Sequence, residues 1–321
     1  MKIILMPGLT LPEFSVDDVA RIRAAAGSDA EVIVTTPAEA PTHAAQVEVI
    51  LGPVPRELLQ AAPRLRWVQA TSSGVDPFMY PEFRDSDVIL TSEKGLVGEH
   101  LADHAFGLLL TLTRQLTRTF RLGPDGWQHR PALRRQMVEL SGLTMGIIGF
   151  GGTGRAVARR AHAFGMHCQA IDRDAVANSP EVSEVQRPAF FPELLATSDV
   201  VAICCPLTSE TKGLFNDAAF AYMKPSALLV NVTRGEVIVE DALVRAIQGK
   251  QIRGAALDVA PREPLPPDSA LWDMENVVMT PHTAGASQYR AGRNIDRFVR
   301  NLEHLRHNEP LEGVIDKQLG Y

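Results

Sequence analysis

Four polar residues between positions 234 and 282 are of the types, and at the spacing, that a reaction centre requires. Arg234, Asp258 and His282 each follow a short apolar run, and Glu263 lies in a proline-rich loop five residues after Asp258. In a parallel α/β sheet, residues just past the carboxyl ends of strands line the ligand crevice. A cation, an imidazole and carboxylates gathered there would suit hydride transfer to a 2-oxo acid.

The residue types suggest a role for each group. Reduction of a carbonyl needs a proton donor near neutral pH, and histidine is the side chain that titrates there. Glu263, placed against the far ring nitrogen, would fix the tautomer of His282 and favour its protonated form. Arg234 offers a planar fork that can bind a carboxylate and polarise the reacting carbonyl. Asp258 is predicted to lie behind these groups and tune them. Each residue alone has an ordinary structural explanation, but three at successive strand ends favour a site.

A glycine fingerprint precedes this region. Residues 143–148 form an apolar strand-like run, and Gly149, Gly151 and Gly154 follow in the pattern G-x-G-x-x-G, with Gly152 and Thr153 between them. The first glycine allows a tight turn, the second a close approach to a pyrophosphate, and the third close helix packing. The strand before the pattern and the predicted helix 155–164 after it indicate a dinucleotide-binding turn.

The next predicted strand, 167–171, ends at Asp172, which lies 23 residues after Gly149. A carboxylate there accepts hydrogen bonds from the adenosine ribose and repels a 2′-phosphate. The expected cofactor is therefore NAD. Arg173 is the alternative contact, because it could accommodate a phosphate if Asp172 turned away.

On these motifs the chain resembles the D-isomer-specific 2-hydroxyacid dehydrogenase family, which includes glyoxylate/hydroxypyruvate reductases and D-3-phosphoglycerate dehydrogenases. The resemblance covers nearly the whole length and is most specific at 149–154, 206–211, 231–235, 256–264 and 280–285. It implies that Arg234 binds substrate, that Glu263 pairs with His282, that His282 is the acid/base and that Asp258 lies near the nicotinamide. Two positions depart from the family pattern: Thr153 replaces a branched apolar residue, and Ala260 stands where an aromatic is usual, which would widen the pocket mouth.

The resemblance also supplies the remaining expected contacts. Substrate is expected at Ser73, Gly74, Arg234 and His282, with the Ser-Gly turn offering backbone N–H groups to a carboxylate. The alternative for that turn is an ordinary β-turn. The expected NAD contacts are Gly149, Gly151, Gly152, Thr153, Gly154, Asp172, Arg173, Cys205, Pro206, Thr211, Thr233, Asp258, His282 and Gly285.

The predicted fold class is α/β, with two Rossmann-like or flavodoxin-like domains, doubly wound parallel sheets and the active site in the interdomain cleft. Residues 1–97 and 287–321 are expected to form a discontinuous substrate-binding domain, and 98–286 the NAD-binding Rossmann domain. In the first domain we expect strands at 2–5, 31–34, 47–51, 67–70 and 88–91, with helices at 17–26 and 56–62. In the second we expect strands near 145–149, 167–171, 199–204, 227–232, 254–258 and 277–280, and a last long helix at 286–307.

One long amphipathic helix is predicted over 98–122, because Leu101, Ala105, Leu108, Leu112 and Leu116 recur at helical spacing. The segment that follows it, up to residue 127, contains Gly-Pro and Asp-Gly steps and is predicted to be an extended arm. The resemblance implies a homodimer through the NAD-binding domain and this 98–127 helix and arm. It also implies that Trp127 reaches the partner's active site, the alternative being that Trp127 packs under its own domain.

Composition limits the other classes of function. The chain has 321 residues, a formal net charge of −6 and a sequence pI of about 5.9, which argues against a nucleic-acid or membrane surface as partner. The first apolar run is short and no run of 18 apolar residues occurs, so a cytoplasmic protein is expected. The three cysteines, Cys168, Cys204 and Cys205, are expected to be buried thiols. No metal is expected at His100 and His104, since no ligand set accompanies them.

The leading hypothesis is therefore an NAD-dependent reductase of a small 2-oxo acid, most simply glyoxylate or hydroxypyruvate. The alternative in the same class is a short D-3-phosphoglycerate dehydrogenase, which would need extra cations near the Ser73–Gly74 turn. Its candidates are Arg56, Arg64, Arg66 and Lys94. A remote alternative from another class is an NAD-sensing scaffold like the dehydrogenase-related transcriptional corepressors.

Overall fold

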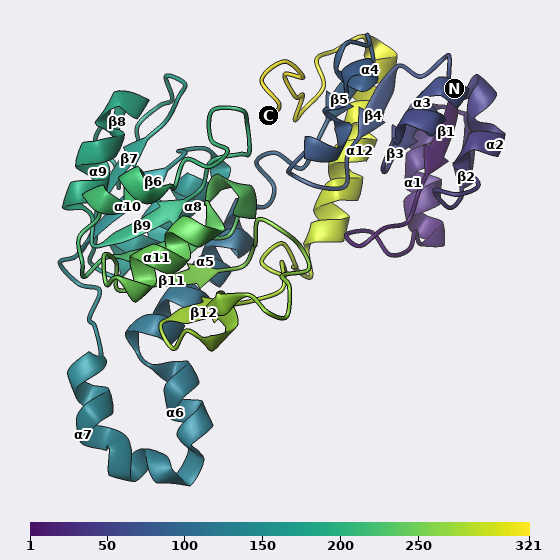
Figure 1. Cartoon of the computed structure of the whole chain (residues 1–321). Helices are drawn as coiled ribbons and strands as arrows, with labels where there is room; N and C mark the ends of the chain where they lie inside the picture. The colour runs from purple at the N-terminus through teal and green to yellow at the C-terminus, as the bar shows by residue number, and fades with distance from the viewer. The chain divides into compact units, whose positions relative to one another are not determined.

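The computed structural model describes all residues from Met1 to Tyr321, and the chain divides into two compact units. Unit 1 comprises Met1–Val97 and Ala286–Tyr321, and unit 2 comprises Gly98–Gly285. Each unit contains one sheet with every strand parallel to its neighbours (Figure 1). None of the helices is both long and apolar enough to span a bilayer.

The sheet of unit 1 has the strand order β2-β1-β3-β4-β5, which is the flavodoxin-like order. Its strands are β1 (Lys2–Leu5), β2 (Glu31–Val34), β3 (Val49–Leu51), β4 (Trp67–Gln69) and β5 (Ile89–Thr91). Its helices are α1 (Val16–Ala26), α2 (Ala40–His43), α3 (Arg56–Ala61), α4 (Pro81–Arg84) and α12 (Arg290–His307), with 3-10 turns η1 (Ala44–Gln46) and η2 (Asp76–Phe78).

Alternating side chains of these strands fill two separate cores, because successive residues of a strand point to opposite faces. On one face Ile4, Ile50 and Val68 pack with residues of α2 and α3. On the other face Ile3, Leu5, Val49, Leu51 and Trp67 pack with α1 and with Ile295, Phe298 and Leu302 of α12. The Trp67 and Phe298 rings stack with their centroids 4.9 Å apart. The C-terminal helix is therefore an integral layer of unit 1.

The sheet of unit 2 has the order β12-β11-β10-β9-β6-β7-β8. Read from β8, this is the Rossmann order extended by one strand. The strands are β6 (Thr144–Ile148), β7 (His167–Ile171), β8 (Val185–Gln186), β9 (Val200–Ile203), β10 (Leu228–Asn231), β11 (Gly254–Leu257) and β12 (Val277–Met279). The predicted pair of doubly wound, Rossmann-like and flavodoxin-like sheets is confirmed, and β8 is an edge strand that was not predicted.

Helices cover both faces of this sheet. The unit contains α5 (Gly98–Thr113), α6 (Leu116–Leu122), α7 (Gly126–Gln136), α8 (Gly152–Ala163), α9 (Phe191–Thr197), α10 (Asp217–Tyr222) and α11 (Glu240–Gln248). Its 3-10 turns are η3 (Gly123–Asp125), η4 (Pro188–Phe190), η5 (Gly235–Val237) and η6 (Ala270–Asp273). Residues of α5 and α8 pack on one face with Ile147, and residues of α9, α10 and α11 pack on the other with Ile148.

The prediction of one continuous helix over 98–122 is wrong. The helix stops at Thr113, Gln115 adopts a left-handed conformation (φ 56°), and α6 begins at Leu116. The expected extended arm is also wrong, because α6, η3 and α7 form a helical hairpin that extends away from the sheet of unit 2 (Figure 1). Arg118 of α6 donates a hydrogen bond to Gln136 of α7 (3.1 Å). Gly123–Asp125 therefore make the turn of a hairpin.

Candidate active site

The expected catalytic residues lie in unit 2, after three strands that are neighbours in its sheet. Arg234 follows β10, Asp258 and Glu263 follow β11, and His282 follows β12. Because the three strands are parallel, their carboxyl ends share one edge. The sheet topology thus brings Arg234 and His282, which are far apart in the sequence, to loops on the same edge of the sheet.

The Arg234 loop is shaped by a buried asparagine and a glycine. The side-chain oxygen of Asn231 accepts hydrogen bonds from the backbone N–H and the hydroxyl of Thr233 (3.0 and 3.1 Å), and its amide donates to the carbonyl of Arg234 (2.9 Å). A Cβ on Gly235 would collide with the backbone of Ala260 and Pro261. Only a glycine therefore lets the half-buried Arg234 lie this close to the loop that carries Glu263.

His282 and Glu263 form a hydrogen-bonded pair, with His282 Nδ1 2.7 Å from Glu263 Oε2. The other carboxylate oxygen of Glu263 accepts the backbone N–H of Ala260 (3.1 Å). The His282 and Glu263 side chains are 43% and 39% exposed, so the pair is open to a small molecule. With Nδ1 bound to the carboxylate, Nε2 is the ring nitrogen that can face a substrate.

Asp258 is the buried anchor of the His282 loop. Its carboxylate accepts the backbone N–H groups of Thr283 and Ala284 (2.9 and 2.8 Å) and the Thr280 hydroxyl (2.6 Å). The backbone N–H of His282 donates to the Asp258 carbonyl (2.8 Å). These bonds hold His282 in a left-handed conformation (φ 54°), which is unusual for a residue with a Cβ. Asp258 therefore fixes the direction in which the His282 side chain leaves the loop.

The structure adds His104 to this group, a residue to which the sequence assigned no role. His104 Nε2 of α5 lies 2.8 Å from the Thr280 hydroxyl and 3.4 Å from Asp258. Its neighbour Asp103 is engaged elsewhere, with Arg160 of α8. No sequence signal distinguishes His104 from His100, which lies one turn earlier on the same helix, so only the fold reveals the contact of His104 with the loop after β12.

The glycine turn after β6 has the geometry of a phosphate cradle. Gly149 has a positive φ (91°), and a Cβ there would lie 2.7 Å from the backbone of Cys205. A Cβ on Gly154 would collide with the Gly149 carbonyl, whereas one on Gly151 would meet nothing within 4 Å. The turn is therefore closed on its protein side and open in front of Gly151, at the start of α8, where backbone N–H groups favour an anion. This arrangement fits a dinucleotide pyrophosphate.

Asp172 stands beside this turn at the end of β7. Its carboxylate accepts the backbone N–H groups of Phe150 (2.6 Å) and Asp174 (2.9 Å). Arg173 lies 3.4 Å from Glu210. The guanidinium of Arg155 binds the carbonyls of Ala177 and Asn178, in the loop that follows Asp172. The structure thus holds Asp172 against the glycine turn.

The other expected cofactor contacts are in three loops of unit 2. After β9, the Thr211 hydroxyl donates to the Pro206 carbonyl (2.7 Å) and accepts the Thr208 N–H (2.8 Å), which closes the 206–211 loop. Burial raises the pKa of Cys205 to about 12, so its thiol stays protonated. Thr233 lies in the Arg234 loop, and Gly285 is the last residue of unit 2.

The expected carboxylate turn, Ser73 and Gly74, lies in unit 1 after β4. The Ser72 hydroxyl donates to the Gly74 carbonyl (2.7 Å), and the Ser72 carbonyl accepts the backbone N–H of Glu93 (3.1 Å). The turn is half-buried. The shape of the turn is therefore set by Ser72, both through its hydroxyl and through its hydrogen bond to the loop after β5.

The two glycines of the cradle give a direct test of where the dinucleotide binds. Gly151→Ala should leave the melting temperature unchanged, because its Cβ meets no protein atom. It should weaken NADH binding by about 1–3 kcal/mol, the usual cost of an inserted methyl group in a packed contact. Gly107→Ala, which also meets nothing within 4 Å, is the matched control and should not alter binding. Fluorescence titration of NADH checks both, and an unchanged Kd in Gly151→Ala would exclude this turn as the cofactor site.

Comparison with known proteins agrees with this geometry. Residues 106–284 match the family model of the D-isomer specific 2-hydroxyacid dehydrogenase NAD-binding domain. A glyoxylate reductase of Korarchaeum cryptofilum is 34% identical over 281 residues, which cover 86% of this chain and 83% of the relative. A glyoxylate/hydroxypyruvate reductase B of Pectobacterium carotovorum is 37% identical, over 84% of each chain.

A solved structure extends the likeness to both units. The NADPH-dependent glyoxylate/hydroxypyruvate reductase of Sinorhizobium meliloti, in complex with NADP and sulfate, superimposes with a TM-score of 0.80 at 27% identity. The superposition covers 100% of this chain and 99% of the other. The chain belongs to the D-isomer specific 2-hydroxyacid dehydrogenase family.

Proposed function

We propose that this dehydrogenase reduces small 2-oxo acids with NADH to 2-hydroxy acids, glyoxylate to glycolate and hydroxypyruvate to D-glycerate foremost. The pairing of His282 with Glu263 at 2.7 Å supports this proposal most strongly. It supplies a residue that can donate or accept a proton, with its imidazole ring oriented by an adjacent carboxylate. Relatives named glyoxylate or hydroxypyruvate reductase, at 32–37% identity, support the substrate class.

Each residue of the site then has one task. When bound, the reduced nicotinamide supplies the hydride. His282 donates a proton from Nε2 to the carbonyl oxygen, and Glu263 stabilises the imidazolium before the transfer. Arg234 binds the substrate carboxylate and polarises the carbonyl with its planar fork. In the oxidation direction the neutral His282 takes the proton back.

Backbone N–H groups of Ser73 and Gly74 are proposed as a further contact for the substrate carboxylate. A phosphorylated substrate would need additional cations near this turn, to bind its phosphate. Two of the candidate cations are already paired, Arg56 with Glu82 (3.1 Å) and Arg66 with Glu48 (3.6 Å). The Lys94 ammonium lies over the Tyr321 ring, 5.4 Å from its centroid. These contacts favour an unphosphorylated 2-oxo acid over 3-phosphohydroxypyruvate.

Loss of NADH absorbance at 340 nm with glyoxylate, hydroxypyruvate and 3-phosphohydroxypyruvate tests the proposal. His282→Ala should lower kcat by roughly 10²–10⁴, the usual loss for a positioned general acid. NADH binding should stay close to wild type, because the glycine turn is untouched. Glu263→Gln should lower kcat by less than His282→Ala does, because His282 Nδ1 loses its charged partner while Nε2 can still face the substrate. A His282→Ala enzyme with half the wild-type activity would remove His282 from the mechanism, and no turnover by wild type on any acid would refute the function.

Cofactor preference is proposed to depend on Asp172. Its carboxylate, held by Phe150 and Asp174, repels a 2′-phosphate, so wild type should prefer NADH to NADPH. Asp172→Ser should shift the ratio of kcat/KM values towards NADPH by about tenfold or more, equivalent to about 1.4 kcal/mol, because the carboxylate no longer repels the 2′-phosphate. Asp174→Ser, which removes a nearby acidic side chain, should change the ratio less. The Sinorhizobium meliloti enzyme is named NADPH-dependent, and a wild type of this chain that prefers NADPH would contradict the assignment.

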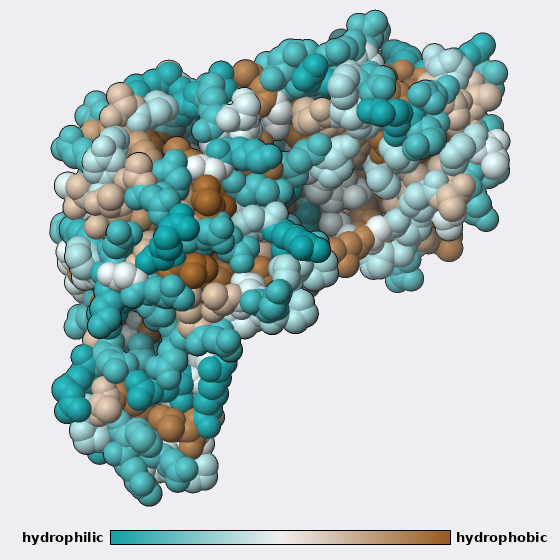
Figure 2. All heavy atoms as spheres, viewed as in Figure 1, coloured by the Kyte–Doolittle hydropathy of each residue, from teal (hydrophilic) through white to brown (hydrophobic).

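We also propose that the protein is a homodimer joined through the α6–α7 hairpin. Phe120 is 76% exposed and Trp127 is 79% exposed, which a solvated surface does not favour. Arg118, Arg121, Arg130, Arg134 and Arg135 surround them in sequence. Figure 2 shows hydrophobic residues gathered on the hairpin among hydrophilic ones. Aromatic residues with arginines are the composition of interface centres.

Light scattering tests the dimer. Wild type should have twice the 35.0 kDa chain mass, and a Phe120→Ser, Trp127→Ser double variant should dissociate, because it removes both exposed rings of the hairpin. Tyr222→Ser removes a 51% exposed aromatic elsewhere on unit 2 and should remain dimeric. A monomeric wild type would refute the dimer. A dimeric Trp127→Ala variant with an unchanged KM would show that Trp127 does not reach the partner's active site.

A further inference from the structure

Two neighbouring loops of unit 1 are joined by backbone hydrogen bonds. The Ser73–Gly74 turn follows β4, and residues 92–95 follow β5, which is the neighbour of β4 in the sheet. Ala70 N–H donates to the Thr91 carbonyl (2.8 Å), and Glu93 N–H donates to the Ser72 carbonyl (3.1 Å). Since the Ser72 hydroxyl binds the Gly74 carbonyl, any shift of Glu93 is passed to the turn.

The Glu93 side chain forms a buried ion pair with Arg290. Glu93 is 1% exposed, and Arg290 Nε lies 3.0 and 3.2 Å from its two carboxylate oxygens. The Asn294 amide, one turn further along α12, donates to Oε1 (2.9 Å). A buried carboxylate is tolerated only when its charge is paired and its lone pairs are satisfied. Arg290 and Asn294 provide both, so α12 fixes the position of Glu93.

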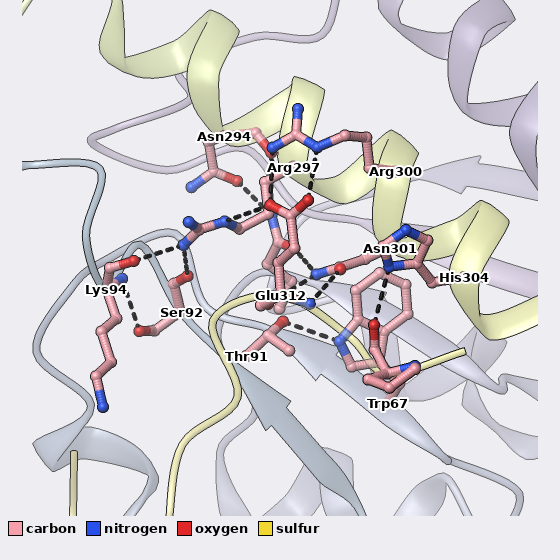
Figure 3. A network of polar contacts seen from close by, with 12 residues as sticks. Trp67, Thr91, Ser92, Lys94, Asn294, Arg297, Arg300, Asn301, His304 and Glu312 are labelled. Carbon is pink, nitrogen blue, oxygen red and sulfur yellow. Dashed lines mark hydrogen bonds and ion pairs between the residues drawn. The ribbon is translucent and has the colours of Figure 1, made fainter. Parts of the chain in front are cut away.

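A second tie holds the same loop without using the Glu93 carboxylate. Arg297, the next residue on this face of α12, donates from Nη1 to the carbonyls of Ser92 and Lys94 (2.8 Å each). Figure 3 shows the Arg297 side chain reaching these two carbonyls on one side and Glu312 on the other. Glu312 also binds Arg300 (2.9 Å), and Ser92 N–H donates to Gly313 (3.0 Å). Arg297 therefore ties Ser92 and Lys94 to α12, so loss of the Glu93–Arg290 pair should disturb the loop locally at Glu93 without unfolding it.

We propose that Glu93 and Arg290 are positioning residues, which hold the Ser73–Gly74 turn ready to bind the carboxylate of a 2-oxo acid. This inference rests on the proposed function. The turn offers backbone N–H groups, and a fixed turn loses little conformational freedom when it binds an anion. Arg290 has an additional effect, because it neutralises a carboxylate that lies next to the anion-binding turn. Neither residue touches the substrate, so their effect should fall on substrate affinity.

The test compares three variants, two single and one double, with a matched control. Arg290→Met leaves a buried anion beside the turn, so KM for glyoxylate should rise by about 10–100-fold with kcat within about threefold of wild type, the pattern of lost substrate binding. Glu93→Gln keeps the hydrogen-bonding shape and should raise KM by less. The double variant Glu93→Gln, Arg290→Met should bind glyoxylate better than Arg290→Met alone, because the unpaired charge is gone. Arg21→Met removes the ion pair of Arg21 with Asp296, also on α12, and should leave KM unchanged.

Two further readouts separate a positioning role from a general loss of structure. NADH affinity should be unchanged in every variant, since the glycine turn is in unit 2. Binding of oxamate, an unreactive 2-oxo acid analogue, should weaken in parallel with KM in calorimetry. An unchanged KM in a folded Arg290→Met protein, or no recovery in the double variant, would overturn the inference. If wild type binds NADH but neither oxamate nor glyoxylate, both the proposed function and this inference fail. If wild type reduces glyoxylate and the Glu93 and Arg290 variants keep the wild-type KM, as Arg21→Met should, this inference alone fails.

Discussion

The buried carboxylate of Asp258 is the interaction on which the geometry of unit 2's candidate site depends. It accepts two backbone N–H groups and one hydroxyl from the loop after β12, and the backbone of Asp258 accepts the N–H of His282. Hydrogen bonds to an ionised acceptor inside a protein are among the stronger ones, and a fully satisfied buried carboxylate resists movement. The strained φ of His282 is stable because this set of bonds determines it. The position of His282 Nδ1 is therefore fixed, and Glu263 can accept its hydrogen bond with little loss of conformational freedom.

Close backbone contacts complete the same edge of the sheet. Gly235 brings the Arg234 loop against Ala260, and Gly149 and Gly154 bring the phosphate turn against Cys205 and the start of α8. In each case a Cβ would occupy the space that the neighbouring backbone fills. The candidate site is thus built from main chain held by glycines and one buried anion, while the reactive side chains project from it. This arrangement lets Arg234, Glu263 and His282 stay partly exposed and still be well positioned.

Much of this could be predicted from sequence, because its signals are local. Apolar runs such as 144–148 and 254–257 end in polar residues, and in a parallel sheet such ends meet at one edge. The break at Gln115 could not be seen, because the leucine spacing continues from Leu112 to Leu116 across it. The Gly-Pro and Asp-Gly steps predict an extended arm, but in the fold they make the turn of a hairpin and begin α7. Glu93 and Arg290 are 197 residues apart, so only the fold reveals their pairing.

In the proposed mechanism, residues at the ends of β10, β11 and β12 protonate and orient a 2-oxo acid for direct hydride transfer to one face. The most direct measurement uses NADH carrying deuterium in the transferable position at C4, with hydroxypyruvate as substrate. The glycerate formed is analysed for its configuration and for deuterium at C2. The proposed mechanism requires wild type to make D-glycerate with one deuterium at C2, and His282→Ala should lose this product. L-glycerate, or glycerate without deuterium at C2, would contradict it.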